Sequence, residues 1–370
     1  MFLSSISLRN IRKHTNIQID FTDKLNYLVG GNGVGKTTIL ESIYYLCTTK
    51  SSIASSDSEV VKMGENSFTI KGHFAGLTND IVQIDYSQNN NKKNYILSNK
   101  QVARFSDIIG KFPVVLLSPA DHSITQGYPA ERRRFVDSVI SQASRTYLNN
   151  LIEYNRTLKQ RTSLLNRLRE HNSKDFSELS AWNKKLVASG VEIIKHRKDF
   201  VGEFEEYIND SYKKILSNKE EPNVQYYFLE GKYPMDLENC FVELLAKKEE
   251  DEIRRGTNLV GPHRDDFIFD INGISLKSYG SQGQHKTFQT VLRFAEFFYL
   301  KDKTGNIPLF LLDDVFGELD ADRAAAISNY LSTVGQAFIT LTDFVNTSFL
   351  KMGVEDKVIK ISEGSNITYA

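Results

Sequence analysis

The chain has 370 residues, of which 40% are hydrophobic and 25% are charged, with 22 Gly and only 7 Pro. This composition excludes a disordered or collagen-like protein, and the length predicts about two to three domains, or one large domain with an insertion. Lys and Arg together number 46, as do Asp and Glu, so the net charge is zero and nucleic acid could bind only at a local basic surface.

The cysteines and the N-terminal residues indicate the cellular compartment in which the protein is expected. Cys47 and Cys240 lie far apart and form no C-x-x-C pair, which argues against a disulfide framework and a cysteine zinc site. The first twenty residues lack the apolar region of a signal peptide, and no run approaches the ~18 apolar residues of a membrane helix. We therefore expect a cytoplasmic protein with no membrane association.

The first fifty residues predict three strands and a helix. Apolar-rich strands are expected at residues 2–8, 17–21 and 25–29, and apolar residues at helical spacing predict a helix at 37–47. A glycine-rich loop separates the third strand from this helix. The order strand, loop, helix is the context in which a backbone loop binds phosphate.

The middle of the chain changes from strand-like to helical texture. Short strand-like runs alternate with polar turns over 51–110, and a buried strand is predicted at 112–117. From about residue 131 to 216 the apolar spacing becomes helical, with a polar interruption at 171–177. Two long helices joined there would form an αα-hairpin roughly 50 Å long, which we interpret as an inserted arm. Its apolar positions keep no extended heptad, which disfavours a long coiled coil.

The C-terminal third returns to alternating strands and helices. Strand texture is found at residues 266–276, a helix is predicted at 284–300, and a buried strand follows at 307–312. The chain therefore divides into a split α/β core, residues 1–125 and 256–370, around a helical arm and connecting subdomain at 126–255.

The strongest motif is a glycine-rich loop that fits G-x-x-x-x-G-K-[ST]. It consists of Gly30, Gly31, Asn32, Gly33, Val34, Gly35, Lys36 and Thr37. The glycines let successive N–H groups face the phosphates of a nucleotide, Lys36 would neutralise the β and γ oxygens, and Thr37 would offer its hydroxyl to Mg²⁺. The alternative is a glycine turn with a chance GKT, which holds only if other nucleotide motifs are absent.

A second motif is an apolar strand that ends in two acids, Asp313 and Asp314. In the Walker B arrangement the first acid holds the magnesium ion, and the second orients or deprotonates the attacking water. Carboxylates commonly end strands at turns, so the pair is weak evidence alone. Together with the loop it predicts an ATP and Mg²⁺ site in which Lys36 and Asp314 are catalytic and Thr37 and Asp313 bind the metal.

The third motif, YGSQGQ at residues 279–284, resembles the LSGGQ signature of ABC-type ATPases, with Gln282 in place of the first glycine. Ser281, Gly283 and Gln284 at a helix N-terminus could form an anion site. In that superfamily the signature of one subunit faces the γ-phosphate held by another, so the resemblance implies a site completed by dimerisation. The simpler interpretation is a helix that Ser281 caps.

The segments that follow Asp313 and Asp314 indicate which branch of the ABC-type ATPases the chain resembles. Residues 317–320 (GELD) stand where these proteins carry their D-loop. Thr342 and Asp343 stand where transporters usually have a switch histidine, whose absence argues against the transporter branch.

Six blocks together resemble the RecF family of bacterial recombination mediators, which are related to chromosome-structural and double-strand-break-repair ATPases. The blocks are residues 6–13 (ISLRNIRK), the GGNGVGKT loop, 127–137 (GYPAERRRFVD), 261–266 (GPHRDD), the YGSQGQ run and 311–320 (LLDDVFGELD). They span nearly the whole chain in the family's order. Val34 and Thr38 depart from the usual glutamine and asparagine, and residues 118–121 (SPAD) occupy the Q-loop region without a glutamine.

The resemblance implies an ABC/SMC-type P-loop ATPase head with an inserted helical arm. It implies ATP and Mg²⁺ as cofactors, slow DNA-stimulated hydrolysis, and a homodimer formed on ATP that binds duplex or gapped DNA. RecO and RecR are the implied partners in loading RecA on single-stranded DNA. By analogy, Arg12 leans toward the nucleotide.

The basic residues of the arm and two residues of the GPHRDD block each allow two interpretations. In residues 131–190 Lys and Arg outnumber Asp and Glu twelve to six, which favours DNA binding on the arm, with compensating acids elsewhere. A solvated helical face is the alternative, and Arg132–Arg134 could equally pair with nearby acids. His263 and Arg264 fit either a structural turn or support of the ATP site.

The other functional hypothesis is an ABC-type ATPase that drives or regulates a different protein, in transport or defence. A P-loop kinase or GTPase is disfavoured, because the signature-like run has no role there and no convincing N-K-x-D follows the acids.

Overall fold

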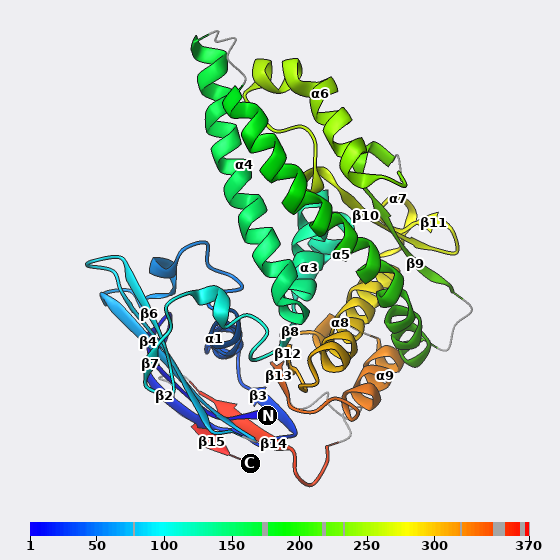
Figure 1. Cartoon of the computed structure of the whole chain (residues 1–370). Coiled ribbons are helices and arrows are strands. Elements are labelled where there is room, and N and C mark those ends of the chain that lie inside the picture. Colours follow the sequence, from blue (N-terminus) through cyan, green and yellow to red (C-terminus); the bar gives the residue numbers. More distant parts are fainter. Residues whose placement is uncertain are drawn as a thin grey trace. The chain divides into compact units, whose positions relative to one another are not determined.

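The computed structural model describes residues 1–76, 78–171, 177–216, 220–231, 234–318, 320–342, 352–362 and 367–369 (Figure 1). Two compact units make up the chain. Unit 1 consists of Met1–Asp121, Asp210–Asn218 and Gln289–Ala370, and unit 2 consists of His122–Asn209 and Lys219–Phe288. Within the described ranges, no helix is both long enough and apolar enough to cross a membrane.

Unit 1 contains a six-stranded sheet with the order β15-β14-β3-β13-β12-β8. Its strands are β3 (Leu25–Val29), β8 (Val114–Leu117), β12 (Leu309–Leu312), β13 (Ala337–Leu341), β14 (Lys357–Ile361) and β15 (Ile367–Tyr369). All neighbouring pairs are parallel except β14 with β15. Since β13 lies between β3 and β12, the glycine-rich loop after β3 and the acids after β12 emerge at the same edge of the sheet.

A second six-stranded sheet of unit 1 is antiparallel, with the order β2-β1-β4-β5-β6-β7. Its strands are β1 (Phe2–Ile11), β2 (His14–Asp20), β4 (Ser67–Ala75), β5 (Asp80–Ser87), β6 (Lys92–Leu97) and β7 (Lys100–Gln101). Buried and less buried residues alternate along β4, as expected for a sheet with one face in the core. Apolar residues of both sheets and of helix α1 (Lys36–Thr48) form one hydrophobic core.

The C-terminal helices of unit 1 pack through aromatic side chains. Helix α8 (Gln282–Thr304) belongs to unit 1 from Gln289 onward, and α9 (Ala321–Leu331) follows β12. Phe294 of α8 stacks on Tyr330 of α9, with ring centroids 4.4 Å apart, and meets Phe310 of β12 edge-on at 4.9 Å. Edge-to-face and offset contacts of this kind stabilise a core beyond the burial of area, so α8 is firmly attached to the sheet that carries the acids.

Unit 2 is mainly helical. It contains α2 (His122–Gln126), α3 (Pro129–Ala143), α4 (Arg145–His171), most of α5 (Ser177–Ile215), α6 (Leu237–Arg255), α7 (Leu276–Tyr279) and the start of α8. Its three-stranded antiparallel sheet has the order β11-β10-β9, from β9 (Pro222–Tyr227), β10 (Asp266–Ile271) and β11 (Ile274–Ser275). The two long helices predicted over 131–216 are α4 and α5, drawn in green in Figure 1. Of the polar interruption predicted at 171–177, residues 172–176 lie outside the described residues.

The two units divide the chain at other positions than the predicted core and arm. Residues 256–288, assigned from the sequence to the split core, lie in unit 2, whereas residues 210–218, assigned to the arm, lie in unit 1. The reason is that β10 pairs with β9, so the 266–276 strand texture belongs to a sheet of unit 2. An ion pair from Arg132 to Asp266 at 2.8 Å adds to this attachment.

Candidate nucleotide-binding site

A cavity of about 360 Å³ lies in unit 1, where β3 and β12 end. It is lined by Arg12, Lys13, Asn32, Gly33, Gly35, Lys36, Thr37, Thr38, Asp313, Asp314, Thr340 and Thr342. The fold thus brings the glycine-rich loop and the paired acids together, although 276 positions separate Thr37 from Asp313. Of the other loop residues, Gly30 and Gly31 contact the Lys36 side chain, and Val34 packs against the core.

Two positions of the loop require glycine, Gly35 because of its backbone conformation and Gly30 because of close packing. Gly35, the N-cap of α1, has φ of 103°, and a Cβ there would lie 2.3 Å from Nε2 of His14. A Cβ on Gly30 would lie 2.3 Å from the carbonyl oxygen of Ile361. The first turn of α1 contains no acidic residue. Because the N-cap and the first turn of α1 line the cavity, they provide a positive helix end suited to phosphate.

His14 supports the loop from beneath. Its side chain is buried, and Nε2 lies 3.1 Å from the carbonyl oxygen of Gly35. Because a carbonyl only accepts, Nε2 carries the proton of this hydrogen bond. Burial lowers the pKa of His14, which keeps the ring neutral at physiological pH.

Lys36 is held inside the loop. Its Nζ donates hydrogen bonds of 2.8 Å to the carbonyl oxygens of Gly30 and Gly31. Burial lowers the pKa of Lys36, and the charges of Asp314 and Asp313 oppose that shift. The ammonium group is thus positioned to exchange carbonyl acceptors for phosphate oxygens, which bind it more strongly because they are charged.

Thr37, Asp313 and Thr340 meet at one carboxylate oxygen. The Thr37 and Thr340 hydroxyls donate to Oδ1 of Asp313 at 3.0 and 2.9 Å. Burial raises the pKa of Asp313, and the two threonine hydrogen bonds, Thr340 first, oppose this. Sequence reasoning missed Thr340, whose only signal was a hydroxyl in the otherwise apolar strand β13.

This donor set fits Mg²⁺. A threonine hydroxyl and a carboxylate oxygen lie together, and Mg²⁺ typically takes one or two protein oxygens with the rest of its coordination from phosphates and water. Over the described part of the chain, His, Cys, Asp and Glu form no cluster of three or more that could bind a metal unaided. The arrangement therefore suits a cation that arrives with a nucleotide.

Asp314 occupies an unusual backbone position. Its φ is 51°, and its N–H donates a 2.8 Å hydrogen bond to the Thr340 hydroxyl. Left-handed backbone is uncommon outside glycine but tolerated by Asp and Asn, and such positions cluster at functional sites. The side chain is exposed at the cavity, where its carboxylate could accept a proton from a bound water.

Arg12 lines the same cavity, at the end of the first hairpin strand. Its Nε and NH2 donate to the two carboxylate oxygens of Glu41 on α1, at 2.7 and 2.9 Å. This bidentate pair raises the pKa of Arg12 and ties β1 to the helix that follows the loop. Arg12 was placed near the nucleotide only by analogy with the family, and Glu41 was missed.

The signature-like run belongs to unit 2, and none of its described residues lines the cavity of unit 1. Ser281 and Gln284 form a reciprocal capping box at the start of α8. The Ser281 N–H donates to Oε1 of Gln284 at 2.9 Å, and the Gln284 N–H donates to Oγ of Ser281 at 3.2 Å. The simpler interpretation of a capped helix is therefore correct for this state. The Ser281 hydroxyl still has its own proton to donate to an anion, beside Gly283 in the first turn.

A buried charge cluster of unit 1 also escaped sequence reasoning. Residues 118–120 line a smaller cavity of about 150 Å³ together with Thr37 and Asp313. The next residue, Asp121, accepts two hydrogen bonds from Arg293 of α8 at 3.0 and 2.7 Å, and Arg293 also donates to Glu296 at 2.6 Å. The Q-loop region is thus fixed to α8 by an arginine. Leu319 of the D-loop and Asp343 lie outside the described residues.

Glu296 predicts a specific pH dependence of stability. Burial raises its pKa to about 7 against an ordinary value of 4.5, with Arg293 opposing. The folded chain therefore holds this proton more tightly, so the contribution to stability is fully present below pH 4.5 and is lost as the pH rises through about 7. We expect the free energy of unfolding to fall between about pH 5 and 8, and Glu296→Gln to reduce the fall, most clearly near pH 7. Urea unfolding at several pH values measures this. The exposed Glu355→Gln serves as control, and equal pH slopes for wild type and Glu296→Gln would contradict the assignment.

Comparisons with known proteins agree with this geometry. A family model described as an AAA domain matches residues 5–257. The DNA replication and repair protein RecF of Chloroherpeton thalassium is 41% identical over 360 residues, covering 93% of this chain and 95% of that protein. The RecF of Salinibacter ruber is 36% identical over 351 residues, covering 92% of this chain and 85% of that protein.

Solved structures give the same answer for the fold. The structure of the recombination mediator protein RecF with ATP, described as part of the RecFOR pathway, superimposes with a TM-score of 0.90 at 29% identity, covering 100% of this chain and 97% of that chain. The Smc head domain of Pyrococcus furiosus matches with a TM-score of 0.57 at 15% identity, which shows a shared fold alone. The predicted fold class, an ABC/SMC-type ATPase head with a helical insertion, is confirmed.

Proposed function

Because the chain belongs to the RecF family of DNA replication and repair proteins, we propose that it is an ATP-gated DNA clamp. In this proposal two copies pair on ATP, the pair binds duplex or gapped DNA, and slow hydrolysis resets it. The observation that carries the proposal is the cavity in which Lys36, Thr37, Asp313 and Asp314 converge.

The roles within the cavity follow from its chemistry. Lys36 and the N–H groups of the loop would hold the β- and γ-phosphates of ATP, and Thr37 and Asp313 would hold Mg²⁺. When bound, Mg²⁺ supplies charge neutralisation between the β- and γ-phosphates. Asp314, exposed at the cavity, would orient or deprotonate the attacking water. Thr340 contacts both acids and would fix their positions.

Pairing of two copies is supported by the signature-like run. Ser281 keeps a proton to donate, and Nε2 of Gln284 already donates to the Glu220 carboxylate at 2.9 Å, a contact that a phosphate of the second copy would replace. The run is not part of the cavity lining of its own chain. We propose that Ser281, Gly283 and Gln284 of one copy contact the γ-phosphate bound by the second copy, and that ATP is therefore required for pairing.

The biological role is proposed from the relatives. The matched RecF structures are described as a recombination mediator in the RecFOR pathway. We propose that RecO and RecR are partners of this chain and that the complex helps to load RecA on single-stranded DNA. Hydrolysis would then limit how long the clamp stays closed.

Gel filtration with light scattering tests the clamp directly. The full chain is run without nucleotide, with ATP and Mg²⁺, and with ATP, Mg²⁺ and gapped DNA, each at two salt concentrations. We expect a monomer in the first case, a dimer in the second and a dimer–DNA complex in the third, weakened by salt. A chain that stays monomeric with ATP, or binds DNA equally with and without ATP, would contradict the proposal.

A further inference from the structure

Two adjoining cavities of unit 2 have no part in the proposed ATP site. The first, of about 440 Å³, is lined by Arg133 and Asp137 of α3, Tyr154 of α4 and His263, among others, and Asp137 is paired with Arg197. The second, of about 350 Å³, is lined by Lys159 of α4, Arg264 and again His263. Residues 151–155 of α4 border the first cavity and residues 158–162 the second. The cavities therefore follow each other along one helix, roughly 10 Å apart at ~1.5 Å per residue.

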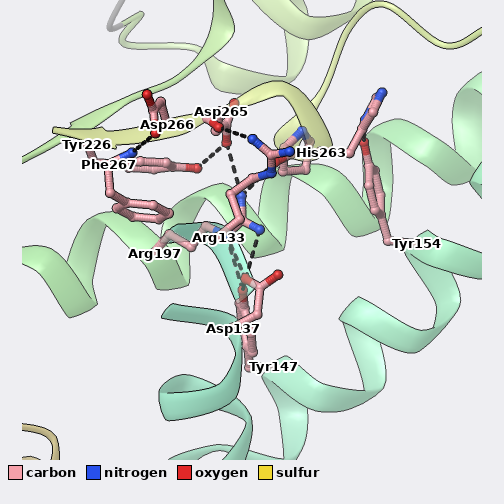
Figure 2. Close-up of polar contacts among 11 residues, drawn as sticks. Arg133, Asp137, Tyr147, Tyr154, Arg197, Tyr226, His263, Asp265, Asp266 and Phe267 are labelled. Atoms are coloured by element: carbon pink, nitrogen blue, oxygen red, sulfur yellow. Dashed lines mark hydrogen bonds and ion pairs between the residues drawn. The ribbon is translucent and has the colours of Figure 1, made fainter. Parts of the chain in front are cut away.

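Most buried arginines of this unit are neutralised by carboxylates. Arg132 pairs with Asp266 at 2.8 Å. Arg161 pairs with Glu252 at 2.5 Å, and both side chains are fully buried. Figure 2 shows Arg197 bonded to Asp137 and to Asp265, at 2.8 and 3.3 Å. These three arginines are structural, because removing one partner would leave a buried charge uncompensated.

Arg133 and Arg264 are held differently. NH1 of Arg133 donates to the backbone carbonyl of Asp265 at 2.6 Å, and Nε and NH2 of Arg264 donate to the carbonyl of Asn258 at 3.1 and 2.6 Å. Among the described residues, neither guanidinium pairs with a carboxylate. A carbonyl fixes the direction of a guanidinium without cancelling its charge. Both side chains therefore present oriented positive charge at the cavities that they line.

The charge of Arg133 is only partly compensated within the chain. The residue is half-buried, and burial followed by the charge of Arg197 lowers its pKa, whereas the charges of Asp265, Asp137 and Asp266 oppose this shift. Its ordinary value is so high that the guanidinium remains protonated at neutral pH. A negative group in the cavity would compensate this charge, with hydroxyl and amide side chains of Ser138 and Asn155 available beside it.

His263 is uncharged and lines both cavities. Its Nε2 lies 3.3 Å from the carbonyl oxygen of Asn258, so Nε2 carries the proton and Nδ1 accepts from the Tyr154 hydroxyl at 2.7 Å (Figure 2). Burial lowers the pKa of His263 to about 4, which keeps the ring neutral at physiological pH. The positive charge of the cavities therefore comes from arginine and lysine and does not change near neutral pH.

We propose that the two cavities form one phosphate-binding groove, in which Arg133 and Arg264 each contact a phosphate of a single DNA backbone. Two sites in a row along α4 favour a repeating polyanion over an isolated phosphate ion, which would need only one. Lys159, exposed at the second site, extends the positive charge along the same line. Contacts to phosphate alone would hold DNA without regard to sequence. The inference rests on the proposed DNA-binding function. It places the DNA-binding surface at Arg264 of the GPHRDD block and at Arg133 of α3.

Charge removal in the full chain tests the groove. Arg133→Gln and Arg264→Gln, singly and together, keep an N–H group for the carbonyl but lose the charge. Binding of fluorescein-labelled gapped duplex is titrated with ATP and Mg²⁺ at a series of salt concentrations. Each substitution is expected to reduce the slope of log affinity against log salt by about 0.9, so that affinity falls about eightfold at 0.1 M salt, and the double variant is expected to lose about twice the slope.

Three controls distinguish loss of phosphate contacts in the groove from misfolding and from loss of ATP binding. Arg167→Gln changes an exposed arginine of α4 that pairs with Glu178 and lines neither cavity, so its salt slope should equal that of wild type. Arg133→Lys and Arg264→Lys should restore the slope, and affinity for a fluorescent ATP analogue should stay unchanged in every variant.

Three results would overturn the groove. An unchanged salt slope in the double variant, with ATP-dependent DNA binding intact in wild type, rejects the groove and leaves the proposed function standing. No ATP-dependent DNA binding by wild type rejects both. Loss of binding to a poly-glutamate peptide with DNA binding unchanged assigns the groove to an acidic protein segment instead.

Discussion

Replacing Lys36 by methionine is expected to lower the affinity for ATP about 100-fold or more. A hydrogen bond to a charged group contributes ~1.5–3 kcal/mol, and Lys36 would make one to each of two phosphates. Methionine has a similar length and is apolar, so the largely buried position can keep its packing. Titration with a fluorescent ATP analogue measures the affinity, and gel filtration should show that the ATP-dependent dimer is lost as well.

Lys50→Met is the matched control for this substitution. Lys50 is exposed, stands just beyond the end of α1, and does not line the cavity. Its affinity for ATP should equal that of wild type. If Lys36→Met still dimerised on ATP with unchanged affinity, the assignment of the loop to phosphate binding would be wrong.

Asp314→Asn is expected to lower the rate of ATP hydrolysis by about 100-fold to 10,000-fold while leaving ATP bound. The amide cannot accept the proton of the attacking water, yet asparagine tolerates the left-handed backbone at φ of 51° as well as aspartate does. The backbone hydrogen bond to Thr340 is therefore preserved. We expect the variant to accumulate as an ATP-bound dimer, visible by gel filtration, with phosphate release as the rate measurement.

Asp313→Asn separates the two acids. Asp313 accepts hydrogen bonds from Thr37 and Thr340, so its replacement should weaken the dependence of ATP affinity on Mg²⁺, whereas Asp314→Asn should not. A monomeric Asp314→Asn with normal turnover would exclude Asp314 as the group that activates water.

Local patterns predicted the elements that carry the ATP site with good accuracy. The strand at 25–29 is β3, and the helix predicted at 37–47 is α1, Lys36–Thr48. The helix predicted at 284–300 is α8, Gln282–Thr304. Apolar spacing and glycine are signals within a few residues of the element, so one sequence suffices to find them. Sheet order and the pairing of β9 with β10 are properties of distant segments, which is why the compact units divide at other positions than the predicted boundary at residue 255.

The same distinction applies to the site. The loop and the paired acids were predicted because their spacing is local, and the fold brings them into one cavity. Thr340, Glu41 and the cluster of Asp121, Arg293 and Glu296 were missed because each matters through a partner far along the chain. A threonine in a strand or an acid in a helix carries no local sign of such a partner.

The sequence alone does not show which basic residues of the arm are paired with acids. The excess of Lys and Arg in residues 131–190 suggested a broadly basic surface. Unit 2 as a whole contains as many Asp and Glu as Lys and Arg, so the compensating acids lie in the same unit. Arg132 and Arg161 form buried ion pairs with Asp266 and Glu252. Arg133, by contrast, donates to a backbone carbonyl and lines a cavity of the proposed groove.

The order of strands in unit 1 has a consequence for how the protein is made. β3 carries the glycine-rich loop, yet its two neighbours, β13 and β14, lie near the end of the chain. At ~5–20 residues per second, a ribosome needs roughly 15–60 s between completing β3 and completing β13. During that interval β3 has neither edge paired, while most of unit 2, a nearly continuous stretch, can already fold. Nucleotide binding therefore cannot begin until synthesis is almost finished, and chains that terminate early expose an unpaired apolar strand.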